Sequence, residues 1–294
     1  MPRRKLYRLK LANRSLLLGE RTLLAGVLNV TPDSFSDGGN FFNLEIAVDA
    51  ALTIERAGAD ILDIGGESTR PGSTGTPAAE EIARVLPVIE ALRGRLKIPI
   101  SIDTQKASVA EIALGAGAEI VNDISGLRRD ARLADVAARH RAPIILMHMR
   151  GTPHTMQKTP FARDALKDVC SGLRESVALA RKAGIAKSQI LLDPGIGFGK
   201  SYAQNYELIA KLGEFAKLGY PLLVGTSRKG FIGATLRGRE KLLSVEKRIW
   251  GTAATVAASI LNGAHIVRVH DVEEMVQVAK VTDCVVNPLL RPKN

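Results

Sequence analysis

Short runs of aliphatic residues alternate along the chain with longer segments in which an apolar residue recurs every three or four positions. The continuous run at 23–29, for example, is followed by a helical pattern at 44–57 that ends against Gly58. A continuous aliphatic run is typical of a parallel strand buried on both faces, and a helical period is typical of an amphipathic helix. The alternation predicts strands at 23–29, 61–64, 99–102, 120–121, 143–147, 189–192, 221–224 and 265–269, and helices at 44–57, 77–92, 107–114, 131–140, within 162–183, and at 202–212, 245–261 and 272–286.

This succession of strand–helix units has the number of repeats that closes a parallel barrel. We therefore predict the α/β class and a (β/α)8 TIM barrel. An open doubly wound sheet is the alternative, although it rarely contains so many regular units without a domain break. Residues 6–18 alternate apolar and basic positions, which predicts a short β extension. Because no linker interrupts the rhythm, the predicted organisation is an N-terminal extension at 1–20 that caps a single barrel domain at 21–294.

The composition excludes several classes of protein. Hydrophobic residues make up 46% of the 294 residues and aromatic residues only 4%, as expected for helices packed on an aliphatic sheet. The two cysteines, Cys170 and Cys284, lie far apart without zinc-ligand spacing, so neither a zinc site nor a disulfide framework is predicted. No membrane-spanning run and no secretion signal is visible, and with the sparse cysteines this predicts a cytoplasmic protein with no membrane partner.

The formal net charge of +11 is consistent with either a nucleic-acid partner or an anionic substrate. The basic residues are dispersed at helical spacing, and aromatic residues are not interleaved among them in the way that base stacking requires. We therefore predict small-molecule substrates and no nucleic-acid partner. The salt dependence of retention on DNA would test this choice.

Polar blocks follow the predicted strands. In a parallel barrel, the carboxyl ends of the strands meet at one mouth, which carries the active site. Segments 31–43, 70–76, 150–160 and 226–243 lack a clear pattern and also follow strands, so we expect them to be loops over that mouth. The side chains predicted to converge there are Asn29, Asp63, Asp103, Asn122, His148, Asp193, Ser227 and His270.

Two carboxylates and an amide in this set indicate hydrogen bonding to a planar polar ligand. Asp103, Asn122 and Asp193 come without a Cys/His cluster, which argues against a transition-metal centre. A carboxylate accepts from both a ring N–H and an exocyclic amino group, so the set suits the edge of an aminopyrimidinone. Capping of three loops is the structural alternative. Asp63 is as consistent with bracing neighbouring loops as with contacting a substrate.

The glycine-rich segment 193–200 follows the sixth predicted strand. It has the pattern GxGxG, which is neither of the glycine patterns that cradle nucleotide phosphates. Its glycines would let the chain turn tightly beside a ligand. Phe198 would then either stack on that ligand or pack in the core.

Basic side chains follow the second, seventh and eighth predicted strands. Several cations around one mouth form an anion site of the kind that suits a diphosphate, because guanidinium and ammonium groups bind phosphate oxygens strongly. A hydroxyl accompanies them at the seventh strand. The residues of this predicted site are Arg70, Ser227, Arg228, Lys229, Arg268 and His270.

A metal ion would enter this site with the substrate. Asn29 offers a neutral oxygen at the end of the first strand, and Mg²⁺ usually keeps its waters and is carried by a diphosphate.

His148 and His154 stand six positions apart with no third ligand, so a structural role is favoured for both over catalysis. No nucleophile motif of a covalent hydrolase is present.

The polar blocks, taken in order, resemble the bacterial dihydropteroate synthase family over roughly residues 20–285. The resemblance is specific because Ser68-Thr69-Arg70-Pro71-Gly72 occurs together with Ser227-Arg228-Lys229. Only the basic N-terminal extension lies outside it. The segments that carry it are 26–39, 65–72, 101–104, 122–126, 147–149, 193–200, 227–229 and 268–271.

This resemblance implies a TIM-barrel transferase that condenses (7,8-dihydropterin-6-yl)methyl diphosphate with 4-aminobenzoate, giving 7,8-dihydropteroate and diphosphate in folate biosynthesis. It also implies Mg²⁺ and a homodimer formed through outer helices, for which 245–261 and 272–286 are sufficiently apolar. Carried over by motif, the catalytic residues are Asp103, Lys229, Arg70 and Asp37. The pterin contacts are Asp103, Asn122, Asp193 and Lys229, with Phe198 nearby. The diphosphate contacts are Arg70, Arg268 and His270, with Asn29 at the metal, and the aminobenzoate contacts are Thr69, Pro71 and Ser227.

Two rival functions share parts of this pattern. A pterin-binding methyltransferase module would keep the pterin-holding residues but would have little use for the diphosphate cluster of Arg70, Arg268 and His270. A catalytically silent paralogue of the synthase would keep the fold without turnover. The complete polar loops favour the active synthase over both.

Overall fold

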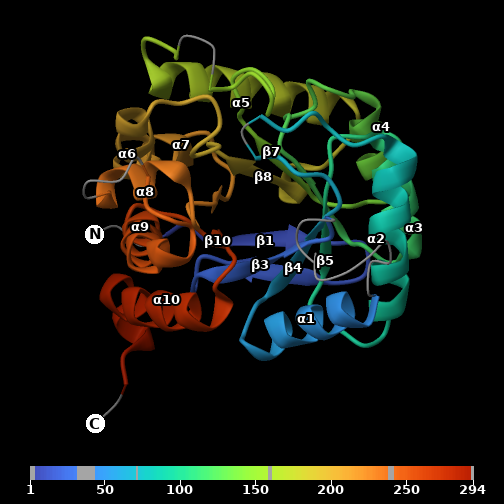
Figure 1. Cartoon of the computed structure of the whole chain (residues 1–294), viewed down its shortest axis with the longest axis horizontal. Helices are drawn as coiled ribbons and strands as arrows, with labels where there is room; N and C mark the ends of the chain where they lie inside the picture. The colour runs from blue at the N-terminus through green and yellow to red at the C-terminus, as the bar shows by residue number, and fades with distance from the viewer. Residues whose placement is uncertain (1–3, 32–43, 71, 158–160, 238–241, 293–294) are drawn as a thin grey trace.

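The computed structural model describes residues 4–31, 44–70, 72–157, 161–237 and 242–292. Its main sheet has eight parallel strands in the order β8-β7-β6-β5-β4-β3-β10-β9, and helices surround it (Figure 1). Aliphatic runs bury both faces of these strands, as the sequence pattern predicts. The strands are β3 (Leu23–Asn29), β4 (Ile61–Gly65), β5 (Ile100–Asp103), β6 (Ile120–Asp123), β7 (Ile144–Met147), β8 (Ile190–Asp193), β9 (Leu223–Val224) and β10 (Ile266–Val269).

The two ends of this sheet meet. A parallel bridge joins Leu192 on β8 to Leu222, the residue before β9. The backbone N–H of Leu192 also donates to the carbonyl of Pro221 at 3.0 Å. The sheet therefore closes on itself, so the predicted TIM barrel is confirmed and the open doubly wound sheet is excluded.

A short hairpin packs at the amino-terminal end of the barrel. β1 (Tyr7–Lys10) and β2 (Ser15–Leu18) pair antiparallel. Leu9 and Leu18 are buried against the interior residues at which the barrel strands begin, such as Ile61 and Ile266. Arg4 precedes the hairpin and forms a buried ion pair of 2.5 Å with Asp283 near the C-terminus. The hairpin therefore packs against the end of the barrel opposite the predicted mouth.

The helices start where local sequence signals favour a start. Ser201 and Gln204 form a reciprocal capping box, and Asp164 accepts from the backbone of Lys167 at 2.9 Å. Within the described ranges, no helix has both the length and the apolarity needed to cross a bilayer. The α-helices are α1 (Leu44–Arg56), α2 (Ala78–Leu92), α3 (Ala107–Ala116), α4 (Arg132–Arg139), α5 (Ala165–Lys182), α6 (Tyr202–Ala210), α7 (Leu212–Ala216), α8 (Gly230–Leu236), α9 (Ile249–Leu261) and α10 (Val272–Val286).

Two helical segments differ from the prediction. The helix predicted at 202–212 ends earlier, and Lys211 separates α6 from α7. The segment after β9, predicted as a loop, contains α8, which begins at Gly230 and includes Gly233. Both glycines lower helix propensity, so no periodic signal marks this helix. Gly233 is required for packing, because a Cβ there would lie 2.6 Å from the Nε of Arg248.

Candidate active site

The barrel mouth contains an acidic network centred on one arginine. Arg268, on β10, donates from Nε to Asp63 Oδ2 at 2.6 Å and from Nη2 to Asp103 Oδ2 at 2.8 Å. Asn122, on β6, donates from Nδ2 to the same oxygen of Asp63 at 3.1 Å. Four strands thus contribute to one hydrogen-bonded group. Asp63 is an internal brace of this network.

Burial shifts the pKa values of the carboxylates at this mouth. Desolvation raises the pKa of Asp103 to about 7, and the guanidinium of Arg268 only partly opposes it. Desolvation also raises the pKa of Asp193, against the opposing charge of Lys229. The neighbouring carboxylates in turn raise the pKa of Arg268 above its ordinary value, so this guanidinium stays charged. The carboxyl group of Asp103 therefore lies close to its protonation equilibrium near neutral pH.

Lys229 also lies at the mouth, near Asp193 and Arg268. Its Nζ lies 4.5 Å from the centre of the Phe198 ring and donates to the carbonyl of Ile196. Burial lowers the pKa of Lys229 to about 8, although the charge of Asp193 opposes this shift. Gly197 makes room for the chain of Lys229, since a Cβ at this position would lie 2.8 Å from the lysine Cδ. The ammonium is thus held over an aromatic face beside a buried carboxylate.

Phe198 takes the core role, one of the two that the sequence left open, and its stacking on a ligand stays a prediction. It packs against a buried cluster that includes Met147, Met149 and Met156. The ammonium of Lys229 also lies over the Phe198 ring. Phe198 therefore connects this buried methionine cluster to the barrel mouth.

Buried hydrogen bonds between side chains and the backbone hold the loop after β8. Asp193 Oδ1 accepts from the backbone of Gly195 at 2.7 Å. Lys200 is buried and donates to the carbonyls of His148 at 2.9 Å and Phe198 at 3.0 Å. Burial lowers the pKa of Lys200 to about 7. Lys200 therefore fastens the loop, a role that the sequence pattern did not reveal.

The histidines of the mouth are neutral structural or hydrogen-bonding groups. His148 is buried beside Lys200, and desolvation lowers its pKa to about 2, which fits the structural role favoured for it. His270 contacts Ser227 through Nδ1 at 3.0 Å, and burial lowers its pKa to about 3. His270 is therefore neutral at physiological pH. In the predicted anion site, His270 would therefore act as a neutral hydrogen-bonding group.

The predicted cluster of cations is only partly assembled. Arg228 has a left-handed backbone (φ 59°) and its guanidinium binds Asp271, with Nε at 3.0 Å, so its charge is already compensated. Arg268 is engaged by two carboxylates. Arg70 is exposed on the loop after β4, and Lys229 lies in the mouth. The mouth therefore carries less free positive charge than the sequence pattern predicts.

The loop after β4 is fastened at its neck by residues that the sequence pattern did not single out. Lys106 donates to Glu67 Oε2 and to Glu81 Oε2, each at 2.5 Å. Glu67 Oε1 accepts from the backbone of Thr76 at 3.1 Å, so one carboxylate bridges the two ends of the loop. Glu81 is fully buried, and desolvation raises its pKa. Thr69, half-buried, lies within the loop that this cluster closes.

Asn29 ends β3 at the rim of the barrel and is half-buried. The described residues contain no group of three His, Cys, Asp or Glu side chains that would cage a metal ion. A single neutral oxygen at the rim fits an ion that keeps most of its own ligands. Two predicted site residues, Asp37 and Pro71, lie outside the described residues.

Comparison with known proteins agrees with this geometry. The model of the pterin binding enzyme family matches residues 25–270. A dihydropteroate synthase from Synechocystis sp. is 51% identical over 265 residues, which cover 90% of each chain. The structure of dihydropteroate synthase from Xanthomonas albilineans with 4-aminobenzoic acid aligns with a TM-score of 0.87 at 43% identity, over 96% of this chain and 99% of that chain.

A second structure of the Xanthomonas albilineans enzyme, in complex with 7,8-dihydropteroate, aligns with a TM-score of 0.84 at 41% identity over 95% of this chain and 99% of that chain. Both the family model and these relatives span nearly the whole barrel, including every strand end described above. The chain therefore belongs to the pterin binding enzyme family and, within it, to the dihydropteroate synthases.

Proposed function

We propose that the residues at the barrel mouth perform the reaction of a dihydropteroate synthase, in which (7,8-dihydropterin-6-yl)methyl diphosphate and 4-aminobenzoate give 7,8-dihydropteroate and diphosphate. The relatives favour this function over a methyltransferase module. The observation that carries the assignment of residues is the set of buried acceptors gathered with Lys229 at one mouth. Product formation by the purified chain tests the function, and the variants below test the residues.

The pterin edge would bind to oxygens that the protein leaves available. Asp103 uses Oδ2 for Arg268, Asp193 uses Oδ1 for Gly195, and Asn122 uses its amide N–H for Asp63. One carboxylate oxygen of each aspartate and the carbonyl of Asn122 are left as acceptors among the described residues. An aminopyrimidinone edge offers ring N–H and amino donors that match such a set. Lys229 would donate to an acceptor on the ring.

The same residues would stabilise the transition state. As the C–O bond to diphosphate breaks, positive charge develops on the pterin methylene carbon, and the electron-rich ring shares it. The carboxylates of Asp103 and Asp193 lower the energy of this charge in a buried site. The arylamine is neutral near pH 7, so its nitrogen attacks that carbon without a general base, and a proton then leaves the nitrogen to water.

The leaving diphosphate would lie toward Asn29, Arg70 and His270. His270 is neutral and would donate a hydrogen bond rather than charge, while Arg70 supplies an exposed cation. Mg²⁺ carried by the diphosphate would neutralise part of the leaving-group charge, and Asn29 would offer it one oxygen. Thr69, Ser227 and, outside the described residues, Pro71 would frame 4-aminobenzoate.

The activity should fall as the pH drops through the neutral range. Burial raises the pKa of Asp103 to about 7, so its carboxylate is present above that pH and is lost below it. A protonated carboxyl group neither stabilises positive charge nor accepts from two pterin donors. We expect kcat/KM for the pterin diphosphate to decline about tenfold per pH unit on the acidic side. Initial rates between pH 5.5 and 8.5 measure this, and a profile that stays flat to pH 5.5 would contradict it.

Lys106→Met should weaken 4-aminobenzoate binding selectively. Without Lys106, the buried charges of Glu67 and Glu81 repel each other and the neck of the Thr69 loop opens. We expect KM for 4-aminobenzoate to rise about tenfold, with a much smaller change for the pterin diphosphate. Lys97→Met, at an exposed lysine before the start of β5 and away from the mouth, is the control. Equal increases in both KM values would mean that Lys106 has only a general structural role.

The chain should also form a homodimer through α9 and α10, which lie side by side (Figure 1). Trp250 on α9 is 81% exposed, and Val281 and Val285 on α10 are 68% and 60% exposed. Such apolar surface on two adjacent helices is typical of a subunit interface. We expect light scattering to give a dimer mass and Val281→Glu to give a monomer. A monomeric wild type would contradict the proposal.

We also propose a cytoplasmic location. Cys170 and Cys284 are both free thiols in the structure, as a reducing compartment would keep them.

A further inference from the structure

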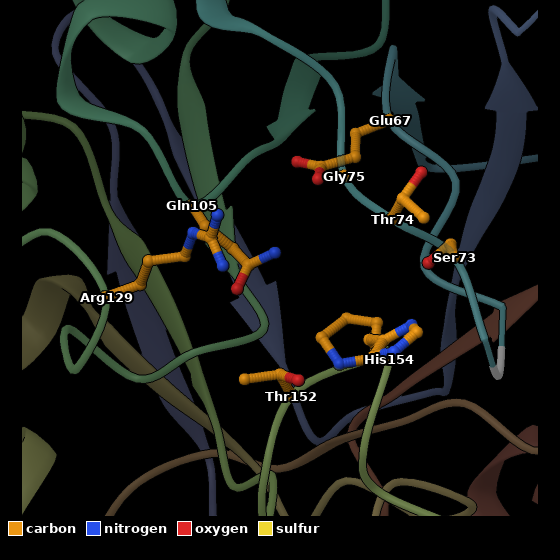
Figure 2. Close-up of a pocket in the computed structure, with 9 residues that line it drawn as sticks. Glu67, Ser73, Thr74, Gly75, Gln105, Arg129, Thr152 and His154 are labelled. Atoms are coloured by element: carbon orange, nitrogen blue, oxygen red, sulfur yellow. The ribbon is translucent and has the colours of Figure 1, made fainter.

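A hollow of about 320 Å³ lies outside the substrate-binding groups described above, between the loops that follow β4, β5, β6 and β7 (Figure 2). None of the residues assigned to the pterin, the diphosphate or 4-aminobenzoate lines it. Its walls include Ser73 from the first of these loops, Gln105 from the second, Arg129 from the third, and Thr152 and His154 from the fourth. This pocket is large enough for an oxyanion with a small organic body.

Gln105 is the most informative side chain of this pocket. It is only 3% exposed, and its amide points into the hollow in Figure 2. Across the described ranges its side chain has no hydrogen-bond partner. The amide of this largely buried side chain therefore has its donor and acceptor available to a group that enters the hollow.

Arg129 and Ser73 make the pocket rich in donors. In the described part of the chain the Arg129 guanidinium forms no ion pair, although the adjacent Asp130 is bound by Arg132. The hydroxyl of Ser73 is also buried without a partner. Arg129 and Gln105 both line the pocket, from the loops after β6 and β5. A guanidinium beside an amide is a common arrangement for binding an oxyanion.

The carboxylate of Glu67 also lies in the wall, but its charge is already compensated. Lys106 binds one of its oxygens at 2.5 Å, and the backbone of Thr76 donates to the other at 3.1 Å. Arg129 therefore sets the sign of the uncompensated charge in the pocket. A cationic or neutral ligand would leave that charge unmatched.

We propose that this pocket binds a small oxyanion, either a carboxylate or a phosphate group, between Gln105 and Arg129. Ser73 belongs to the loop that also carries Thr69 and Arg70, so a bound oxyanion would link that loop to the loops after β5 and β6. The site is separate from the reaction described above, and its test does not depend on turnover.

The test follows the side-chain amide of Gln105 by nitrogen-15 NMR in the full-length chain, with the resonance assigned by its loss in Gln105→Leu. Inorganic phosphate and acetate are titrated separately at constant ionic strength. We expect a saturable shift of this resonance, and we expect Arg129→Gln to weaken the apparent affinity about tenfold. The anion with the lower dissociation constant identifies the group that the pocket prefers.

Arg132→Gln is the matched control, because Arg132 is 81% exposed, binds Asp130 and does not line the pocket. It should retain the wild-type affinity. A Gln105 resonance that neither anion moves, or a shift that is the same in Arg129→Gln as in the wild type, would overturn the proposal. Anion binding at the substrate site does not confuse the result, because the reporter group lies in the pocket itself.

Discussion

Lys229→Met should lower kcat/KM by about a thousandfold, which is the size expected when a buried charged donor to the reacting ligand is removed. The ammonium lies over Phe198 and beside Asp193, where burial lowers its pKa to about 8. Without it, Asp193 loses the cation that best supports its ionised form, and its pKa rises further. The variant therefore loses a donor to the pterin and part of the negative charge that stabilises the transition state.

Steady-state kinetics with both substrates measure this effect. Lys229→Arg should not restore activity, because Gly197 leaves room only for a slender chain at this position. Lys211→Met serves as the control, since Lys211 lies half-exposed on the outside of the barrel and binds only Glu207. A loss of less than tenfold in Lys229→Met would remove Lys229 from the catalytic machinery.

Arg268→Met should lower the free energy of unfolding by about 3–5 kcal/mol, because it leaves buried carboxylates without their counter-ion. Arg268 binds Asp63 at 2.6 Å and Asp103 at 2.8 Å, and Asp63 is 2% exposed. The neighbouring Asp193 would lose a more distant cation as well. Urea denaturation at pH 8 measures this loss, and activity should disappear with it.

The loss should shrink as the pH is lowered. Burial already raises the pKa of Asp103 to about 7, and removing the opposing charge of Arg268 raises it further, so the folded variant binds more protons than the folded wild type at intermediate pH. Lowering the pH from 8 to 5 therefore recovers stability relative to the wild type. Arg21→Met is the control, because Arg21 binds Asp60 with 53% of its side chain exposed and should contribute about 1 kcal/mol or less. A pH-independent difference for Arg268→Met would contradict the assigned pairing.

The barrel was predictable because its signals are local and repeated. Each of the eight strands is a continuous aliphatic run, and most helices have a clear period with an end signal such as Gly58 or Gly184. Helix α8, which the sequence pattern did not predict, shows that local signals do not specify every element. Gly230 and Gly233 argue against a helix, whereas in the fold the helix buries Phe231 and Ile232 and packs Gly233 against Arg248.

The mouth was predictable as a set of positions but not as a set of partners. Strand ends identified Asp103, Asn122 and Asp193, because barrel topology brings such ends together. The sequence did not show that Arg228 binds Asp271, since the two residues lie on loops whose geometry depends on the whole fold. Nor did it show that burial keeps His270 neutral.

The residues that hold the neck of the loop after β4 were not identified from the sequence, for a similar reason. Lys106, Glu67 and Glu81 look like ordinary surface charges in the sequence, and only the fold brings them together in a largely buried cluster. A signal was nevertheless present: Glu67 follows a strand-end Gly-Gly pair, and Lys106 stands three positions after Asp103. Charged residues that immediately follow strand-end blocks are therefore good candidates for positioning roles.

The most direct test of the central claim is diphosphate release by the purified chain with dihydropterin diphosphate, Mg²⁺ and 4-aminobenzoate. We predict release that depends on 4-aminobenzoate, with one dihydropteroate formed for each diphosphate, and loss of both products in Lys229→Ala and Arg268→Ala. Binding of the pterin diphosphate without turnover, or release that proceeds equally without 4-aminobenzoate, would contradict the account.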